Sequence, residues 1–265
     1  MGSWLAEHHF VVTAFVAGIL ASLACGLGAL PLAFQGLKLE RKVGLGYAFA
    51  GGLMFSASVY NLLLPAFSLG ATRTGGFVPV LQTLGGMAAG ALLLHWIEHS
   101  LTPARLDQPA LRIFRGRAGA LIFLGMLFHS LPEGVAVGVG YGAETHLSAN
   151  EGFGRFIALA IGFHNVPEGL AVALPLRAKG ASILSCFLLA TATSLPQPIA
   201  AVPSSLLVWL FEPLMLPLLG FAAGAMMYLV LLELLPEALE RHGRAETAWS
   251  FLGGFGLMAL VQAGL

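Results

Sequence analysis

Long apolar runs separated by short polar connections constrain this chain more than any other feature of its sequence. A helix that crosses the hydrocarbon core of a bilayer needs about 20 mostly apolar residues. The connections between the runs are short, except for the one between Glu98 and Arg117. The runs that meet the length requirement are 10–34, 44–68, 77–97, 118–141, 153–175, 181–210, 214–236 and 247–264.

The composition supports a lipid environment. Of the 265 residues, 57% are hydrophobic and only 10% are charged, whereas a soluble domain is usually about a quarter charged. The 34 glycines suit close packing between membrane helices. We therefore predict an all-α membrane protein of eight transmembrane helices, forming a single polytopic domain over residues 1–265. A net charge of zero gives no indication of a nucleic-acid partner.

The ends of the runs carry two smaller signals. Glu7 and no Lys or Arg precede the first apolar run, so this run is interpreted as a first membrane span and not as a cleaved signal peptide. Cys25 and Cys186 both lie in apolar runs. They are better explained as small packing residues than as a disulfide.

Loop charges predict the orientation, because Lys and Arg concentrate on the cytoplasmic side of membrane proteins. Arg73 and Arg155 occupy one set of alternate loops, and the other set holds 11 of the 13 basic residues. With eight spans, both termini then lie outside. The basic set is Lys38, Arg41, Lys42, Arg105, Arg112, Arg115, Arg117, Arg177, Lys179, Arg241 and Arg244.

One motif occurs twice. "FHSLPEGVAV" begins at Phe128 and "FHNVPEGLAV" begins at Phe163, an offset of 35 residues. The copies fall in the fourth and fifth spans, which run in opposite directions. A pseudo-two-fold axis in the membrane plane would face them toward each other, as in transporters built from inverted repeats. Spans four and five are thus the expected pseudo-symmetric pair.

The repeat places ligand-type side chains together. His and Glu four residues apart share one face of a helix, which pairs His129 with Glu133 and His164 with Glu168. Two imidazoles and two carboxylates form a nitrogen and oxygen set suited to Zn²⁺ or a similar divalent ion.

The energetic cost of these residues favours the same interpretation. A charge at bilayer depth costs at least about 2.5–3.5 kcal/mol on insertion scales, and a divalent ion cancels two carboxylates. Pro132 and Pro167 also free carbonyls of the preceding turn. The alternative is that the motif supplies polar contacts between helices without binding a metal, and its duplication argues against this.

Two further spans offer candidates. Gln197 lies between Pro196 and Pro198, which must deform the sixth span, so its side chain is a candidate lining for a cavity. A kinked packing helix is the alternative. Met54 in the second span offers a soft thioether. Methionine in an apolar run is usually filler, so both readings stay open.

A second cluster is expected at the cytoplasmic ends. His95, Glu98 and His99 share one face at the end of span three, and Glu233 and Glu237 close span seven. They form a candidate relay where ions leave the protein. Ordinary interfacial charge is the alternative, and it fits Glu237 better than Glu233, which lies about one turn deeper.

These motifs resemble the ZIP (Zrt/Irt-like) family of divalent metal transporters, in its GufA-like branch, along almost the whole chain. The family patterns HNxPEG, xNxPEGLAVxLPLR, SGxxEP and ExxPE correspond to FHSLPEG, HNVPEGLAVALPLR, TSLPQP and ELLPE, and WIEH carries the acidic residue that closes span three. The doubled PEG motif and the LPLR tail are highly specific.

The resemblance implies an eight-helix transporter that moves zinc, or in some members iron, manganese or cadmium, toward the cytoplasm. It implies a four-helix transport bundle moving against a scaffold, dimers in some members, and here the inner membrane of a prokaryote. Asn165 is expected beside a second ion position, and Glu98 and Glu233 on the exit route. The residues implied around the ion are Met54, His129, Glu133, His164, Glu168 and Gln197.

Two departures from the family pattern concern the number of ions. Ser130 stands where the family usually has Asn, and Gln197 where it usually has Glu. Two divalent ions would bring four positive charges against the two carboxylates of Glu133 and Glu168, a costly imbalance in a low dielectric. We therefore expect a single ion.

Two rival classes remain. An intramembrane metal-dependent hydrolase needs three protein ligands, a water and a general base. This chain has no HExxH, and a duplicated motif suits a pathway better than an asymmetric catalytic centre. A passive metal channel or a metal sensor shares the same ligand chemistry, and the sequence does not distinguish it from a carrier. The protein is expected to need no cofactor beyond the ion itself.

Overall fold

The computed structural model of the chain describes residues 8–33, 43–73, 76–100, 117–145, 152–178 and 180–264; the side chains of 72, 73, 98, 100, 117–125, 175 and 178 lie outside that description. Every regular element in these ranges is a helix, which confirms the all-α prediction. The first half of the chain contains α2 (His9–Leu27), η1 (Leu30–Ala33), α3 (Val43–Ala57), η3 (Ser58–Leu63), α4 (Leu64–Arg73), α5 (Val78–Ser100) and α7 (Arg117–Glu144). The second half contains α8 (Phe153–Ala178), α9 (Ile183–Thr193), α10 (Pro196–Leu210), η5 (Glu212–Leu214), α11 (Met215–Leu229), η6 (Val230–Leu234), α12 (Leu235–Arg241) and α13 (Arg244–Gly264).

Several of these elements join into longer rods. The π-helical turns η3 and η6 connect α3 to α4 and α11 to α12, and a proline follows each of them, Pro65 and Pro236. By length and composition, six helical stretches of the described chain can cross a membrane, and α7 and α13 are not among them. The protein is a multi-pass membrane protein, and the count of eight spans stays a prediction. The six stretches are His9–Ala33, Val43–Ala71, Val78–Ile97, Phe153–Leu174, Ile183–Leu210 and Glu212–Arg241.

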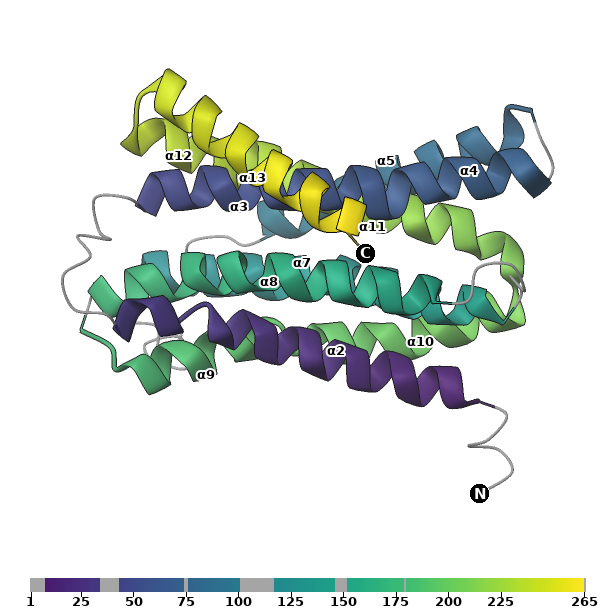
Figure 1. Ribbon diagram of the computed structural model, residues 1–265, viewed down its shortest axis with the longest axis horizontal. Coiled ribbons are helices and arrows are strands. Elements are labelled where there is room, and N and C mark those ends of the chain that lie inside the picture. The colour runs from purple at the N-terminus through teal and green to yellow at the C-terminus, as the bar shows by residue number, and fades with distance from the viewer. Residues whose placement is uncertain are drawn as a thin grey trace.

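The rods are arranged in two layers (Figure 1). One layer contains α2, α7, α8 and the pair α9 and α10, and we call it the site layer. The other contains α3 with α4, α5, α11 with α12, and α13, and we call it the support layer. Helices far apart in sequence pack together in each layer, such as α7 with α10 and α5 with α11.

Contacts inside a layer differ in kind from contacts between layers. Inside the site layer, a Cβ at Gly138 of α7 would overlap the Ala201 carbonyl of α10; inside the support layer, a Cβ at Gly90 of α5 would overlap the Phe221 carbonyl of α11. Glycine is required there because the backbones touch. Between the layers, apolar side chains pack together, with Met54 of α3 in the same buried cluster as Leu174 of α8. Each layer is therefore internally interlocked, whereas apolar side chains pack between the layers.

The fourth and fifth predicted spans meet as the repeat requires. Contacts join Gly140 to Gly154 near the α7–α8 connection, and Glu133 to His164 further along both helices. The pairing advances in opposite directions along the two helices, so α7 and α8 are antiparallel.

Candidate metal site

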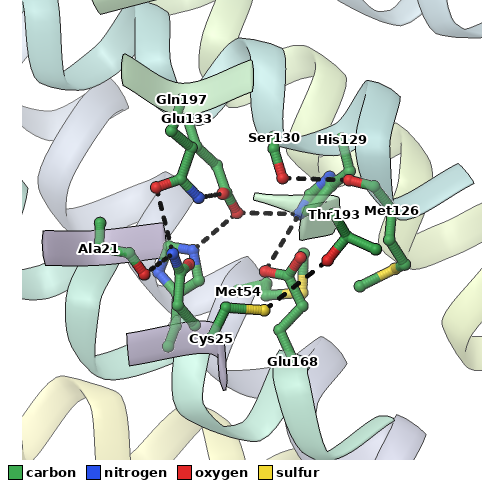
Figure 2. Close-up of polar contacts among 12 residues, drawn as sticks. Ala21, Cys25, Met54, Met126, His129, Ser130, Glu133, Glu168, Thr193 and Gln197 are labelled. Carbon is green, nitrogen blue, oxygen red and sulfur yellow. Dashed lines mark hydrogen bonds and ion pairs between the residues drawn. The ribbon is translucent and has the colours of Figure 1, made fainter. Parts of the chain in front are cut away.

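The four His and Glu residues of the repeat converge inside the site layer, and Figure 2 labels three of them, His129, Glu133 and Glu168. His129 Nε2 lies 3.1 Å from Glu133 Oε1 and 4.0 Å from Glu168 Oε2, and His164 Nε2 lies 3.0 Å from the same Glu133 oxygen. All four side chains are fully buried. One ligand atom each from His129, Glu133 and Glu168 lie within 4.8 Å of one another. That spacing is compact enough for one cation to contact all three.

Local sequence and helix packing produce this convergence together. The spacing of four residues puts His129 and Glu133 on one face of α7, and His164 and Glu168 on one face of α8. The antiparallel contact of the two helices then turns these faces toward each other. Small residues allow the approach, because a Cβ at Gly140 would stand 2.9 Å from the Gly154 Cα.

The two carboxylates have unequal surroundings. Glu133 contacts both imidazoles and also accepts a hydrogen bond from the Gln197 amide nitrogen. Neither oxygen of Glu168 accepts a hydrogen bond from any residue that the structure describes. A buried carboxylate without donors is costly, and a cation beside it removes that cost. Glu168 is therefore the bare acceptor of the site.

Gln197 connects three helices of the site layer. Its amide nitrogen donates to Glu133, and its carbonyl oxygen accepts a hydrogen bond of 3.2 Å from Asn165 Nδ2. Asn165 Nδ2 also donates to the Ala21 carbonyl of α2 at 3.0 Å, and Asn165 Oδ1 has no hydrogen-bond partner among the described residues. In this arrangement the Gln197 oxygen is engaged by an amide.

The predicted deformation of the sixth span is confirmed. α9 ends at Thr193 and α10 begins at Pro196, so the rod is interrupted beside Gln197. The Ser194 amide bonds back to the Thr191 carbonyl at 3.1 Å, which closes α9. From α2, Ser22 Oγ donates to the Ser194 carbonyl at 2.6 Å and stabilises the interruption. Sequence reasoning missed this link and the one to Ala21, because backbone carbonyls leave no signature in the sequence.

The remaining residues expected at the site are placed as follows. Met54 of α3 is fully buried in the cluster that joins the two layers, and Figure 2 draws it in the same view as the His and Glu residues. Ser130 Oγ donates to the Met126 carbonyl of its own helix at 3.1 Å. Cys25 and Cys186 are both buried and free, in agreement with their expected lack of a disulfide.

The cluster expected at the cytoplasmic ends is looser. The rings of His95 and His99 are 4.1 Å apart, and His95 Nδ1 is 2.7 Å from the Tyr228 hydroxyl of α11. Glu237 is engaged by Arg241, whose Nε donates to it at 2.7 Å.

Glu233 and Glu98 are also expected in the cluster at the cytoplasmic ends. Glu233 is exposed on η6, and the Glu98 side chain lies outside the described residues. Among the described side chains, three metal ligands come together only at His129, Glu133 and Glu168. The prediction of orientation rests on basic loop residues, and several of these lie outside the described ranges. They are Lys38, Arg41, Lys42, Arg105, Arg112, Arg115 and Lys179.

A buried His and Glu centre in a multi-pass membrane protein is typical of the class of integral membrane proteins that transport cations. The comparisons specify it further. The profile of the ZIP Zinc transporter family matches residues 107–262. The chain is 34% identical over 249 residues to the zinc transporter GufA of Myxococcus xanthus, covering 89% of this chain and 94% of that protein.

Two more relatives agree. Identity to the human zinc transporter ZIP11 is 44% over 147 residues, which are 55% of this chain and 43% of that protein. Identity to the zinc transporter ZupT of Stenotrophomonas maltophilia (strain K279a) is 29% over 262 residues and covers 91% of each protein. The chain belongs to the ZIP family and is GufA-like. It is accordingly a transporter of divalent metal ions and not an enzyme, which removes the hydrolase reading.

Proposed function

We propose that this protein carries Zn²⁺, or a similar divalent ion such as Cd²⁺, Fe²⁺ or Mn²⁺, toward the cytoplasm through the buried His and Glu site. The observation that carries the proposal is Glu168. Its carboxylate is fully buried and accepts no hydrogen bond from the described residues, yet it faces His129 across 4.0 Å. A divalent ion between these groups supplies the missing positive charge, and the imidazoles supply nitrogen ligands of the kind zinc prefers.

We further propose one ion at a time. Glu133 and Glu168 together balance one divalent ion, and Gln197 adds no charge. The Ser130 hydroxyl bonds to its own helix, and the Gln197 oxygen bonds to Asn165. The groups that would serve a second ion are therefore neutral and already engaged. Met54, His164, Asn165 and Gln197 complete the proposed surroundings of the ion.

The path and its direction follow from the charge pattern. Eight spans over residues 1–265, with both termini outside, place the basic loops in the cytoplasm. We propose the inner membrane of a prokaryote, since relatives in Myxococcus and Stenotrophomonas match the chain along most of its length. On the inner side, His95, Glu98, His99, Glu233 and Glu237 assist release of the ion. The interlocked layers favour a carrier in which the site layer moves against the support layer. A homodimer is part of this proposal.

The test is uptake of zinc into proteoliposomes by purified protein. We expect saturating uptake by the wild type, and a fall to the level of empty liposomes for Glu168→Ala and Glu133→Ala, because each change leaves the ion without its charge partner. Glu240→Ala, at an exposed position of α12, is the matched control and keeps wild-type uptake. Wild-type uptake by folded Glu168→Ala protein would refute the proposed site.

A further inference from the structure

Cys25 of α2 lies against the helix that carries Glu168. The thiol side chain is fully buried. A Cβ at Gly169, the residue directly after Glu168, would overlap the carbonyl oxygen of Cys25, so the two backbones touch at this point. α2 and α8 therefore cross where one presents a thiol and the other a bare carboxylate. The repeat motif gave no indication of this partner, because α2 carries no copy of it.

The surroundings of the thiol are polar. Cys25 Sγ lies 3.9 Å from Thr193 Oγ1, which is itself 2.6 Å from the Ala190 carbonyl (Figure 2). The Ser194 hydroxyl is fully buried and has no hydrogen-bond partner among the described residues. A free cysteine usually packs as a small apolar group, whereas the sulfur of this one has a hydroxyl oxygen 3.9 Å away.

The chemistry of this group differs from that of the His and Glu centre. Thiolates are soft ligands and bind soft cations more strongly than carboxylates or hydroxyls do. On metal binding the thiol releases its proton, and the negative sulfur then adds to the charge of Glu168. Figure 2 shows Cys25 and Glu168 as separate ligand-type side chains that come from different helices of the site layer.

We propose that Cys25 is a specificity-determining ligand that, together with Glu168, favours soft divalent cations over hard ones during transport. This inference rests on the proposed transport function. In the proposed orientation α8 runs inward, so Glu168 lies one turn further in than His164. An ion that leaves His164 toward the cytoplasm therefore meets Glu168 and Cys25 next.

The experiment uses Cd²⁺ as the soft probe and the full-length protein. Cadmium bound to a thiolate gives an ultraviolet charge-transfer band, which carboxylate and imidazole ligands do not produce. We expect this band in the wild type and in Cys186→Ser. We expect it to be absent in Cys25→Ser, with Cd²⁺ affinity lowered by about tenfold and Zn²⁺ affinity lowered less. Cys186 is the matched control because it is also buried, with its thiol 3.7 Å from the Ala173 carbonyl.

The outcomes separate this inference from the proposed function. Zinc uptake by Cys25→Ser together with loss of the band supports both. If the wild type transports zinc and binds Cd²⁺ without the band, or if Cys25→Ser keeps the band, the role of Cys25 is refuted and the transport function stands. If the wild type shows no saturable metal uptake, the transport function itself fails. Cys25→Ala serves as the second variant if Cys25→Ser does not fold, with the same expected loss of the band.

Discussion

At the scale of single residues, the site is less symmetric than its repeated motif. His129 and His164 both contact Glu133, and the Gln197 amide nitrogen donates a hydrogen bond to it. Glu168 occupies the equivalent place in the other copy of the motif and receives no hydrogen bond from the described chain. Glu133 is thus held in position before an ion arrives, and Glu168 is the group whose surroundings an ion changes most.

The neutral amide of Gln197 gives the first prediction at this scale. In Gln197→Glu, the donor to Glu133 is replaced by a third acid, so the carboxylates repel one another in the absence of metal. We expect a lower melting temperature without metal, and a larger rise on adding Zn²⁺ than in the wild type, because binding to the folded state stabilises it. Equilibrium binding should give one ion in the transport site of the wild type and up to two in the variant.

Matched measurements can contradict this prediction. Gln197→Asn keeps a neutral amide and is the control, for which we expect no second ion. Two well-occupied ions bridged by Glu133 and Glu168 in the wild type would show that the charge argument for a single ion is wrong.

At the scale of elements, backbone contacts decide how the helices of the site layer are placed. Gly169 of α8 touches Cys25 of α2, and Gly138 of α7 touches Ala201 of α10. These contacts leave no room for a Cβ, so the side chains next to them have little freedom to shift. The interruption between α9 and α10 lies directly beside Gln197, which donates a hydrogen bond to Glu133.

Two glycines of α8 provide a matched test of these contacts. Gly169→Ala inserts a methyl group into the Cys25 carbonyl, and overpacking of this kind typically costs about 1–3 kcal/mol. We expect a lower melting temperature in detergent and reduced zinc uptake. Gly162→Ala changes the same helix where nothing lies within 4 Å of an added Cβ. Alanine is the better helix former, so this control should be unchanged or slightly more stable. Equal losses in both variants would mean that the crossing of α2 and α8 does not set the stability.

At the scale of the whole molecule, the contacts within each layer differ from those between the layers. Glycine contacts join helices within each layer, while Met54 and Leu174 belong to the apolar surface between the layers. Apolar packing is not directional, so it permits one layer to shift against the other. The proposed carrier mechanism depends on this difference between the two kinds of contact.

Cross-linking tests whether the layers move. A Cβ at Gly46 of α3 would lie 4.0 Å from Leu174 Cδ1 of α8, so Gly46→Cys with Leu174→Cys can be bridged across the layers by a short bifunctional thiol reagent. The native thiols are first removed by Cys25→Ser and Cys186→Ser. We expect the bridged protein to lose zinc uptake and to regain it when the bridge is cleaved.

The control bridge lies within one layer. A Cβ at Gly51 would stand 3.6 Å from Leu234 Cβ, both in the support layer, which is a disulfide separation. Gly51→Cys with Leu234→Cys should keep its uptake when bridged. Full zinc uptake by completely bridged Gly46→Cys, Leu174→Cys protein would contradict movement of the site layer against the support layer.

What the sequence by itself determined is the class of protein and most of its candidate ligands. Apolar runs of bilayer length, the spacing of four residues between His129 and Glu133, and Pro196 beside Gln197 are local features, and helix geometry converts each of them directly into structure. The family resemblance came from the same short motifs, and the comparisons confirmed it.

Only the tertiary structure decided which groups face one another. It brought Cys25 against Gly169, next to Glu168, and gave the Gln197 oxygen to Asn165. It left one carboxylate bare while the other is hydrogen-bonded to His164 and Gln197. The physical reason is that these contacts join helices far apart in the chain through backbone atoms and small residues. Helical periodicity predicts which face of a helix a residue occupies. Only the packing of the helices determines which residues lie opposite that face.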